Sequence, residues 1–267
     1  MSSYPEESVK SADGTVIAFD RRGEGPAVVL VQGAFAERRQ PMMAAIASAL
    51  ARWFTVFNYD RRGRGGSGDT PPYAVEREIE DLAAVVEAAG GSAMVFGGSS
   101  GAALALEAAA VNPAISKLAV WEPPYHVDES APALSPGFTA ELGALVAAGR
   151  RAEVVERFMA AAGVPPEAVA MMRAQPTWEQ AEAVAHTLVY EAAVLRAGEE
   201  LPAARLAAIG QPTLVLNGAD SPAWMAKAGV AVAAAVPGAV LRVLEDQAHN
   251  VAPKALAPEL LEFFVAG

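Results

Sequence analysis

A serine flanked by small residues stands where two kinds of sequence pattern meet. The motif Gly97-Gly98-Ser99-Ser100-Gly101 follows an apolar run at residues 93–96 and precedes an alanine-rich helical pattern that begins at Ala102. This order predicts a sharp turn from a strand into a helix, where only small residues let the two elements approach closely. Gly97 and Gly101 lie two positions on either side of Ser99, so Ser99 is the predicted nucleophile.

A serine hydroxyl is a useful nucleophile at neutral pH only when a base takes its proton and a third group orients that base. The chain has three histidines and no cysteine. His249 lies in a polar loop, residues 244–250, and loops at strand ends commonly carry catalytic side chains. His186 lies inside a helical pattern and His126 follows a Pro-Pro pair, so both are expected to be structural or to line a pocket. His249 is therefore the predicted general base.

The predicted orienting acid is Asp220. Residues 213–216 are apolar and indicate a buried strand, and Asn217-Gly218-Ala219-Asp220 follows directly. Asp220 therefore leaves the carboxyl end of a strand. The chain order of Ser99, Asp220 and His249 is serine, acid, histidine, which differs from the orders found in chymotrypsin and subtilisin.

Asp220 also has a structural interpretation, and two other carboxylates compete with it for the role of the acid. Asp220 follows Asn-Gly and could simply form a turn. Glu122 comes directly after the apolar run at residues 117–121 and is the alternative acid. Asp246 lies three residues before the histidine and is expected to be an ordinary loop carboxylate.

Together, the serine motif and the order of its partners resemble those of the α/β-hydrolase family, in its serine-nucleophile branch of capped esterases and carbon–carbon bond hydrolases. The turn at Ser99 is similar to the nucleophile elbow of that family. The amide of Ser100, at the start of the elbow helix, is one expected oxyanion donor. The resemblance implies a second donor after the strand at residues 26–31, where the amide of Ala34 takes the role. The family usually has His-Gly at this turn, but this chain has Gln32-Gly33.

The resemblance implies acyl transfer through an acyl-enzyme on Ser99. Because the elbow carries serine, the epoxide hydrolase and dehalogenase branches, which use an aspartate nucleophile, are disfavoured. The expected reaction is hydrolysis of a carboxylic ester or lactone of a small, largely apolar molecule. A carbon–carbon bond hydrolase, thioesterase, amidase or perhydrolase on the same triad stays open, as does a non-hydrolytic ligand-binding protein with this fold.

The elements that must position these residues alternate along the chain. Short apolar runs separated by helical patterns predict a mostly parallel, doubly wound sheet, preceded by a hairpin at residues 7–20. The resemblance implies eight strands. The expected inner strands are residues 26–31, 54–59, 93–96, 117–121, 213–216 and 239–244, and the expected helices lie near 37–52, 73–89, 101–111, 223–235 and 252–265.

One interval breaks this alternation. Between Trp121 and Gln211 the sequence holds only helical patterns interrupted by prolines. By resemblance, this interval is a helical cap inserted after the sixth strand, covering the serine and shaping the substrate cavity. The expected organisation is a core domain of residues 1–122 and 202–267 with a cap, or lid, of residues 123–201.

A glycine-rich stretch suggests a different protein class when it is read alone. The residues Gly63-Arg64-Gly65-Gly66-Ser67-Gly68 match the dinucleotide-binding pattern G-x-G-x-x-G. That pattern requires a helix to begin at the last glycines, but Asp69-Thr70-Pro71-Pro72 follows instead. Residues 60–65 resemble a structural loop of α/β-hydrolases. No cofactor and no metal are therefore expected.

Composition limits the partners. The formal charge is −11, with 31 acidic and 20 basic residues, which disfavours nucleic acid and anionic membranes. Hydrophobic residues make up 53% of the chain, yet no uninterrupted apolar stretch of membrane-spanning length occurs. Residues 1–10 show no secretory signal pattern. We therefore expect a cytoplasmic monomer or homodimer that acts on a small-molecule substrate.

Overall fold

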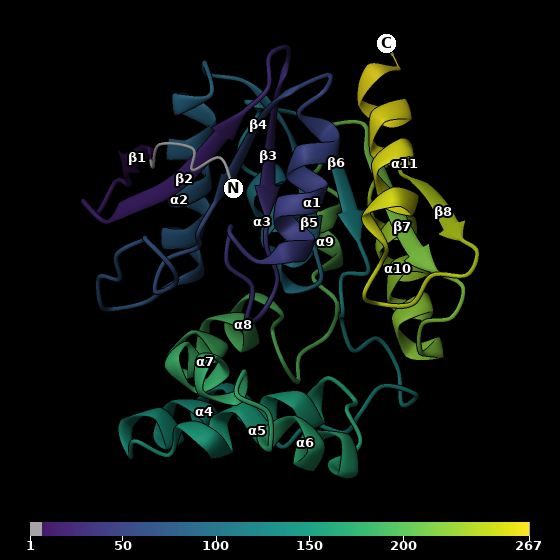
Figure 1. Ribbon diagram of the computed structural model, residues 1–267. Helices are drawn as coiled ribbons and strands as arrows, with labels where there is room; N and C mark the ends of the chain where they lie inside the picture. The colour runs from purple at the N-terminus through teal and green to yellow at the C-terminus, as the bar shows by residue number, and fades with distance from the viewer. Residues whose placement is uncertain (1–6, 267) are drawn as a thin grey trace.

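An eight-stranded twisted sheet runs through the centre of the molecule (Figure 1). The computed structural model describes residues 7–266 of the 267-residue chain. The strand order is β1-β2-β4-β3-β5-β6-β7-β8, in which the pairs β1–β2 and β2–β4 are antiparallel and all others are parallel. The strands are β1 (Glu7–Lys10), β2 (Val16–Arg22), β3 (Ala27–Val31), β4 (Thr55–Tyr59), β5 (Ala93–Gly98), β6 (Ile115–Trp121), β7 (Thr213–Gly218) and β8 (Val240–Leu244). The mostly parallel sheet predicted from the alternating pattern is therefore present.

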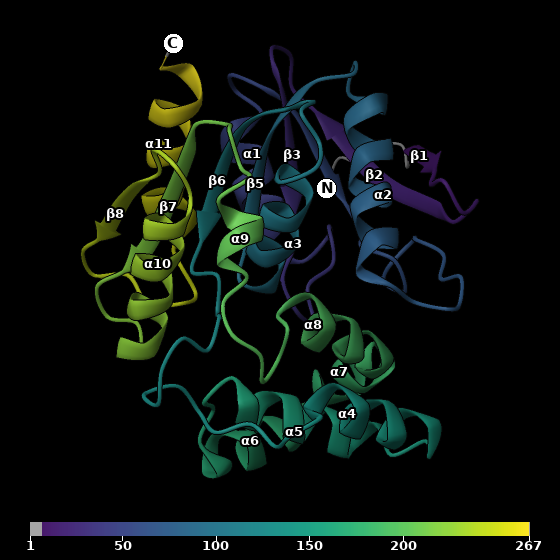
Figure 2. The same cartoon turned by 180° about the vertical axis from the view of Figure 1, so that it is seen from behind.

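Helices cover both faces of the sheet. The helices α1 (Pro41–Leu50) and α11 (Pro253–Val265) lie on the face toward the viewer in Figure 1. Figure 2 shows the opposite face, covered by α2 (Val75–Ala88), α3 (Ser100–Ala109), α9 (Ala203–Leu206) and α10 (Ala223–Ala235). Because successive strand residues point to opposite faces, both sides of a central strand must be apolar to be covered in this way.

Strand β3 illustrates this two-sided burial. Val29 and Val31 pack into the core beneath α2 and α3, whereas Val28 and Leu30 pack into the core beneath α1 and α11. All four side chains are fully buried. A continuous apolar run therefore forms a strand here, because no position of the run faces water.

The interval between β6 and β7 forms a separate layer of helices, which we call the α4–α8 layer. It comprises α4 (Phe138–Ala147), α5 (Arg151–Ala161), α6 (Pro166–Arg173), α7 (Trp178–Ala183), a 3₁₀ turn (Ala185–Thr187) and α8 (Leu188–Val194). This layer has its own apolar core, which includes Phe138, Leu142, Val155 and Leu188. In Figure 1 the arrowheads of β3, β6 and β7 point toward it. The layer thus lies at the carboxyl ends of the parallel strands, where active sites of such sheets form.

The domain boundaries given above stay a prediction, and residues 1–6, used in the expectation about a secretory signal, lie outside the described residues. Within residues 7–266, no helix combines the length and apolar character that crossing a bilayer requires.

Candidate active site

Ser99 occupies a strained turn between β5 and α3. Its backbone has φ 57° and ψ −129°, a conformation that a residue with a side chain rarely adopts. A Cβ atom on Gly101 would stand 2.5 Å from the carbonyl oxygens of Val31 and Gln32. A Cβ atom on Gly97 would stand 2.5 Å from the carbonyl oxygen of Gly101. Helix and sheet therefore meet so closely that only glycine fits at both positions, as the motif predicts.

His249 reaches the Ser99 hydroxyl from the loop between β8 and α11. Its Nε2 atom lies 3.1 Å from Oγ of Ser99, which is hydrogen-bond distance. The indole N–H of Trp121 donates to the carbonyl oxygen of His249 at 2.9 Å, so the backbone of this loop is held against the end of β6. The imidazole is only partly buried, with 32% of its side chain exposed.

Glu122 holds the other side of the imidazole. Its Oε2 atom lies 2.7 Å from Nδ1 of His249, and its Oε1 atom accepts the amide N–H of Gly218 at 2.8 Å. The carboxylate is completely buried. Register explains the placement: Gly98 pairs with Trp121, so Ser99 and Glu122 follow directly at the ends of two neighbouring strands.

The prediction of Asp220 as the acid does not agree with this geometry. Asp220 is exposed, and its amide N–H donates to the carbonyl oxygen of Gln247 at 2.9 Å. The preceding residue, Ala219, donates to the carbonyl oxygen of Leu244. The chain beyond β7 thus follows β8, toward the sheet edge and away from β6. The structure places the alternative, Glu122, on the histidine; Asp246 is also exposed.

The turn after β3 packs directly against the elbow. A Cβ atom on Gly33 would stand 2.9 Å from Cβ of Ser99 and 2.9 Å from the carbonyl oxygen of Gly98. Ala34 and Ser100 line the same cavity as Ser99. Among residues 7–266, no hydrogen bond occupies the amide of either Ala34 or Ser100. Both amides are therefore available to an oxygen atom bound next to Ser99, and the amino end of α3 favours negative charge there.

The side chain of Gln32 is part of the core. It is 1% exposed, and its amide donates to Oδ1 of Asn58 at 2.8 Å and to the carbonyl oxygen of Tyr59 at 3.1 Å. These two acceptors lie at the end of β4. Gln32 therefore links the turn to β4. It occupies the position at which the resemblance implies a histidine.

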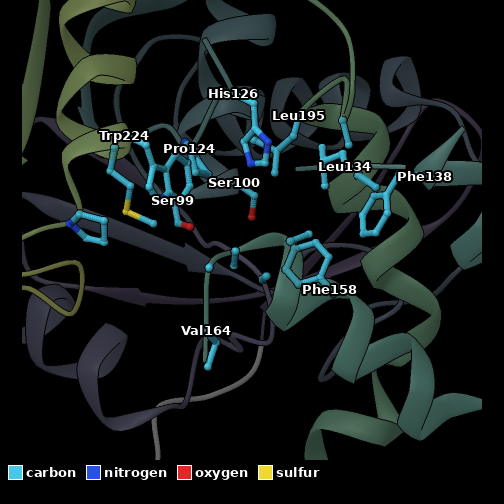
Figure 3. Close-up of a pocket in the computed structure, with 18 of the residues that line it drawn as sticks. Ser99, Ser100, Pro124, His126, Leu134, Phe138, Phe158, Val164, Leu195 and Trp224 are labelled. Atoms are coloured by element: carbon cyan, nitrogen blue, oxygen red, sulfur yellow. The ribbon is translucent and has the colours of Figure 1, made fainter. Parts of the chain in front are cut away.

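A cavity of about 370 Å³ opens between the sheet and the α4–α8 layer, with Ser99 and His249 in its wall. Figure 3 shows Ser99 and Ser100 among mainly apolar side chains from both regions. The residues labelled there are Ser99, Ser100, Pro124, His126, Leu134, Phe138, Phe158, Val164, Leu195 and Trp224. This size and lining are typical of a site for a small organic ligand.

A second cavity of about 280 Å³ also reaches Ser99 and His249. It extends toward α1 and α6, and its lining is again largely apolar. Met42, Met159 and Met172 line this cavity but not the larger one, whereas Trp224 lines only the larger one. Ser99 thus stands between two apolar spaces.

The other two histidines lie apart from the Ser99 hydroxyl. His126 lines the larger cavity and packs its ring edge-on against Trp224, with 5.2 Å between ring centroids. Burial lowers the pKa of His126, opposed by hydrogen bonds to the backbone of Ala161 and Pro132. His186 lies 3.6 Å from a carboxylate oxygen of Asp69, and burial lowers its pKa as well. The lining role expected for His126 is therefore present.

The glycine-rich loop after β4 packs closely around the carboxylate of Asp60, a residue of the same loop. A Cβ atom on Gly65 would stand 2.0 Å from Oδ2 of Asp60, and that oxygen accepts the amide N–H of Gly66 at 2.8 Å. The N–H groups of Gly63, Arg64, Gly66 and Ser67 all donate to oxygen atoms of residues 60–68, so the loop uses them itself and does not offer them to a phosphate. In the described part of the chain, no group of three or more histidine, aspartate or glutamate side chains is arranged to hold a metal ion.

Two groups of site residues were not indicated by the sequence. Trp224 and Met225, at the start of α10, line the larger cavity. The one sequence feature that could have indicated them is their position at the start of the helix that follows β7. Arg61 and Arg64, in the loop after β4, donate to carbonyl oxygens of the Gln32–Ala34 turn. No residue pattern pairs that loop with the turn, because the contact depends on the packing of β3 beside β4.

Comparison with known proteins places this chain in a family. A model of the alpha/beta hydrolase family matches residues 28–259. An alpha/beta hydrolase from Sphaerobacter thermophilus DSM 20745 has a similar structure, with a TM-score of 0.90 and 54% identity, covering 97% of this chain and 100% of the other. A hydrolase from Pseudomonas aeruginosa PA01 has a TM-score of 0.75 and 28% identity, covering 99% and 100%.

A curated relative, the uncharacterized hydrolase YraK of Bacillus subtilis (strain 168), is 35% identical over 98 residues. That match spans 35% of this chain and 35% of the relative, so it concerns about a third of each protein. The family match covers far more than half of the chain. The protein therefore belongs to the alpha/beta hydrolase family, and the predictions of this fold class and of a hydrolase are confirmed.

Proposed function

We propose that this protein is a serine hydrolase that cleaves carboxylic esters or lactones through an acyl-enzyme on Ser99. The observation that carries the proposal is the position of His249, with Ser99 at one ring nitrogen and Glu122 at the other. This is the geometry of a nucleophile, a base and an orienting acid.

In the first step, acylation of Ser99, the hydroxyl proton of the serine moves to His249. Ser99 Oγ donates its proton to Nε2 of His249 while it attacks the ester carbonyl carbon, and the resulting imidazolium returns a proton to the departing alkoxide. Glu122 accepts the N–H at Nδ1, which keeps the correct tautomer in place and stabilises the positive charge on the ring. Its second oxygen is held by Gly218, so the carboxylate cannot easily turn away.

The carbonyl oxygen becomes negatively charged during the attack. The amides of Ala34 and Ser100 are the proposed donors to this oxygen, because both border the cavity at Ser99. A water molecule activated by His249 then attacks the acyl-enzyme, and Ser99 leaves with the proton returned to it. The products are a carboxylic acid and an alcohol, or a hydroxy acid from a lactone.

The two apolar cavities indicate the kind of substrate. Since both reach Ser99, an ester placed at the serine can extend an apolar group in each direction. The α4–α8 layer supplies walls to both cavities, so we propose that residues 123–201 act as the cap that selects the substrate. Thioester, peroxyacid and carbon–carbon bond chemistry would use the same triad, and substrate turnover decides among them.

Covalent labelling tests the nucleophile. The purified protein is treated with an alkyl fluorophosphonate, digested and mapped by mass spectrometry, in parallel with the Ser99→Ala and Ser100→Ala variants. We expect the label on Ser99 in the wild type and in Ser100→Ala, and none in Ser99→Ala. Ser100 is the matched control because its hydroxyl is the neighbouring one and is buried.

Turnover then tests the reaction. p-Nitrophenyl esters with acyl chains of increasing length and a set of aliphatic lactones are offered to the same three proteins. The proposal requires hydrolysis by the wild type and its loss in Ser99→Ala. If the wild type is neither labelled nor active, yet binds apolar ketones in the cavity, the protein is a ligand-binding member of the fold and the proposal fails.

A further inference from the structure

Arg64 hydrogen-bonds the peptide group that carries the proposed oxyanion donor. Its Nη1 atom donates to the carbonyl oxygen of Gly33 at 2.7 Å. The carbonyl of Gly33 and the N–H of Ala34 belong to one planar trans peptide group, so both bonds lie in one plane and point in opposite directions. A donor that fixes the oxygen of Gly33 therefore also fixes the direction of the Ala34 N–H.

Arg61 holds the preceding peptide group of the same turn. Its Nη1 atom donates to the carbonyl oxygen of Gln32 at 3.1 Å, and this carbonyl shares its plane with the N–H of Gly33. Both arginines come from the loop after β4 and are buried, with exposures of 2% each. The turn is thus held by two cations at consecutive peptide groups.

Both arginines are anchored by a single carboxylate of the α4–α8 layer. Glu191, in α8, accepts from Nη1 of Arg61 at 2.9 Å with each of its oxygens and also accepts from Nη2 of Arg64. Glu191 is completely buried. Because α8 belongs to the layer that covers Ser99, this contact links the covering layer to the turn.

The rest of the cluster balances its charge. Glu78, in α2, pairs with Nε and Nη2 of Arg61 at 2.7 Å each and accepts the hydroxyl of Tyr73 at 2.9 Å. Burial raises the pKa of Glu78, but the charge and hydrogen bonds of Arg61 outweigh burial and lower it. The Nε atom of Arg64 donates to the hydroxyl of Thr187 at 3.1 Å. Two guanidinium groups therefore face two carboxylates in a site without bulk water.

We propose that Arg64 and Glu191 are positioning residues for the oxyanion hole, and that α8 thereby controls the donor strength of the Ala34 amide. This inference rests on the proposed ester hydrolysis. A cation at the oxygen of Gly33 polarises the peptide group and makes the N–H of Ala34 a stronger donor. The effect grows with the negative charge on the substrate oxygen, so it favours the transition state over the bound substrate.

The test compares Arg64→Met with Arg62→Met. Arg62 is another buried arginine of the same loop, but it pairs with Asp81 and Asp13, away from the turn. We expect Arg64→Met to lower kcat by roughly 10- to 100-fold, less than the loss of a whole oxyanion donor. KM should stay within about threefold, since ground-state binding uses the donor less. Arg62→Met should keep kcat even where it loses stability.

A transition-state analogue separates positioning from a structural role. An alkyl trifluoromethyl ketone forms an oxyanion adduct with a serine, so its affinity for Arg64→Met should fall by the same factor as kcat. Arg64→Lys should recover part of this loss, and Glu191→Gln should lose affinity in the same direction. If Arg64→Met and Arg62→Met retain the same kcat and analogue affinity, the proposal is overturned.

Hydrogen exchange at the Ala34 amide tests the positioning role of Arg64 independently of ester hydrolysis. In Arg64→Met the Ala34 amide should exchange more slowly than in the wild type, because the loss of the cation at the oxygen of Gly33 makes the N–H less acidic. In Arg62→Met its rate should be unchanged. If the wild type hydrolyses no ester, the proposed function fails, but unequal exchange at Ala34 still supports the positioning role of Arg64. Equal exchange in the two variants rejects that role, whatever the activity.

Discussion

Glu122 and His249 come from loops that follow different strands, yet Oε2 of Glu122 lies 2.7 Å from Nδ1 of His249. The carboxylate is fully buried and also accepts the amide of Gly218. A buried, doubly bonded carboxylate is well suited to hold an imidazole in one tautomer and orientation. Asp220 is exposed and has no such environment.

We expect Glu122→Gln to abolish most of the activity while Asp220→Asn retains it. The amide of glutamine can donate to Nδ1 and favour the wrong tautomer, so kcat should fall by roughly 10³- to 10⁴-fold. Steady-state kinetics with a p-nitrophenyl ester measures both variants. A large loss in Asp220→Asn with near-normal activity in Glu122→Gln would reverse the assignment.

Gly101→Ala should destabilise the fold and remove activity. The added methyl would stand 2.5 Å from the carbonyl oxygens of Val31 and Gln32, so β3 and α3 must move apart. We expect the free energy of unfolding to fall by roughly 1–3 kcal/mol. Gly98→Ala is the matched control, because its Cβ would meet nothing closer than 4.0 Å. Equal urea midpoints for the two variants would contradict the close approach.

Gln32→Met should lower stability with little effect on the chemistry. The substitution leaves Oδ1 of Asn58 without the donor it has at 2.8 Å, which should cost roughly 1–3 kcal/mol. The proposed oxyanion donor is the backbone of Ala34, so kcat should stay within a few fold. A stable variant with a hundredfold lower kcat would instead place the Gln32 side chain in the reaction. Urea denaturation and ester kinetics supply the two measurements.

Apolar ligands in the cavity lined by His126 should bind more weakly as the pH falls below 6.5, the ordinary pKa of histidine. Burial lowers the pKa of His126, so the ring is neutral above 6.5 and gains its charge only as the pH drops through its lowered pKa. A charged ring in an apolar cavity costs free energy, and a ligand that covers it increases that cost.

Calorimetry with the non-reacting Ser99→Ala variant measures this dependence from about pH 5 to about pH 8, the range in which histidine titrates. The pH dependence due to His126 should be absent when His126→Phe is added. An unchanged dependence would assign it to another group in the cavity.

Changes in the two cavities should alter the preference on different sides of the ester. Trp224 lines only the larger cavity and Met172 only the smaller one. Trp224→Leu should therefore change kcat/KM in either the acyl-chain series or the alcohol-chain series, and Met172→Ala in the other. Two matched series of straight-chain esters provide the measurement. If both variants change the same series, the substrate does not extend into both cavities.

Much of the architecture could be predicted because its signals are local. The strands, the flanking helices and the strand-free interval follow from apolar runs and helical periodicity, which reflect burial of each segment. Ser99 can be predicted because the elbow needs glycine on both sides of it, and the structure shows which atoms a side chain at each glycine would meet. His249 can be predicted from its polar loop, and the structure brings it to the serine.

The acid could not be chosen in the same way. Asp220 and Glu122 both follow apolar strands, so the local sequence pattern does not distinguish between them. The choice depends on the order of strands in the sheet: β6 lies beside β5, whereas the chain leaving β7 follows β8. The link from Arg64 to Glu191 has the same origin, since it joins residues 127 positions apart.

The amino-acid sequence by itself determined the class of fold and which serine and histidine are predicted as nucleophile and base, because each is encoded by residues that are neighbours along the chain. Tertiary structure alone decided which carboxylate meets His249, what Gln32 does and which side chains surround Ser99. These depend on distances between segments far apart in sequence, and such distances are set only when the sheet is assembled and the helices pack on it.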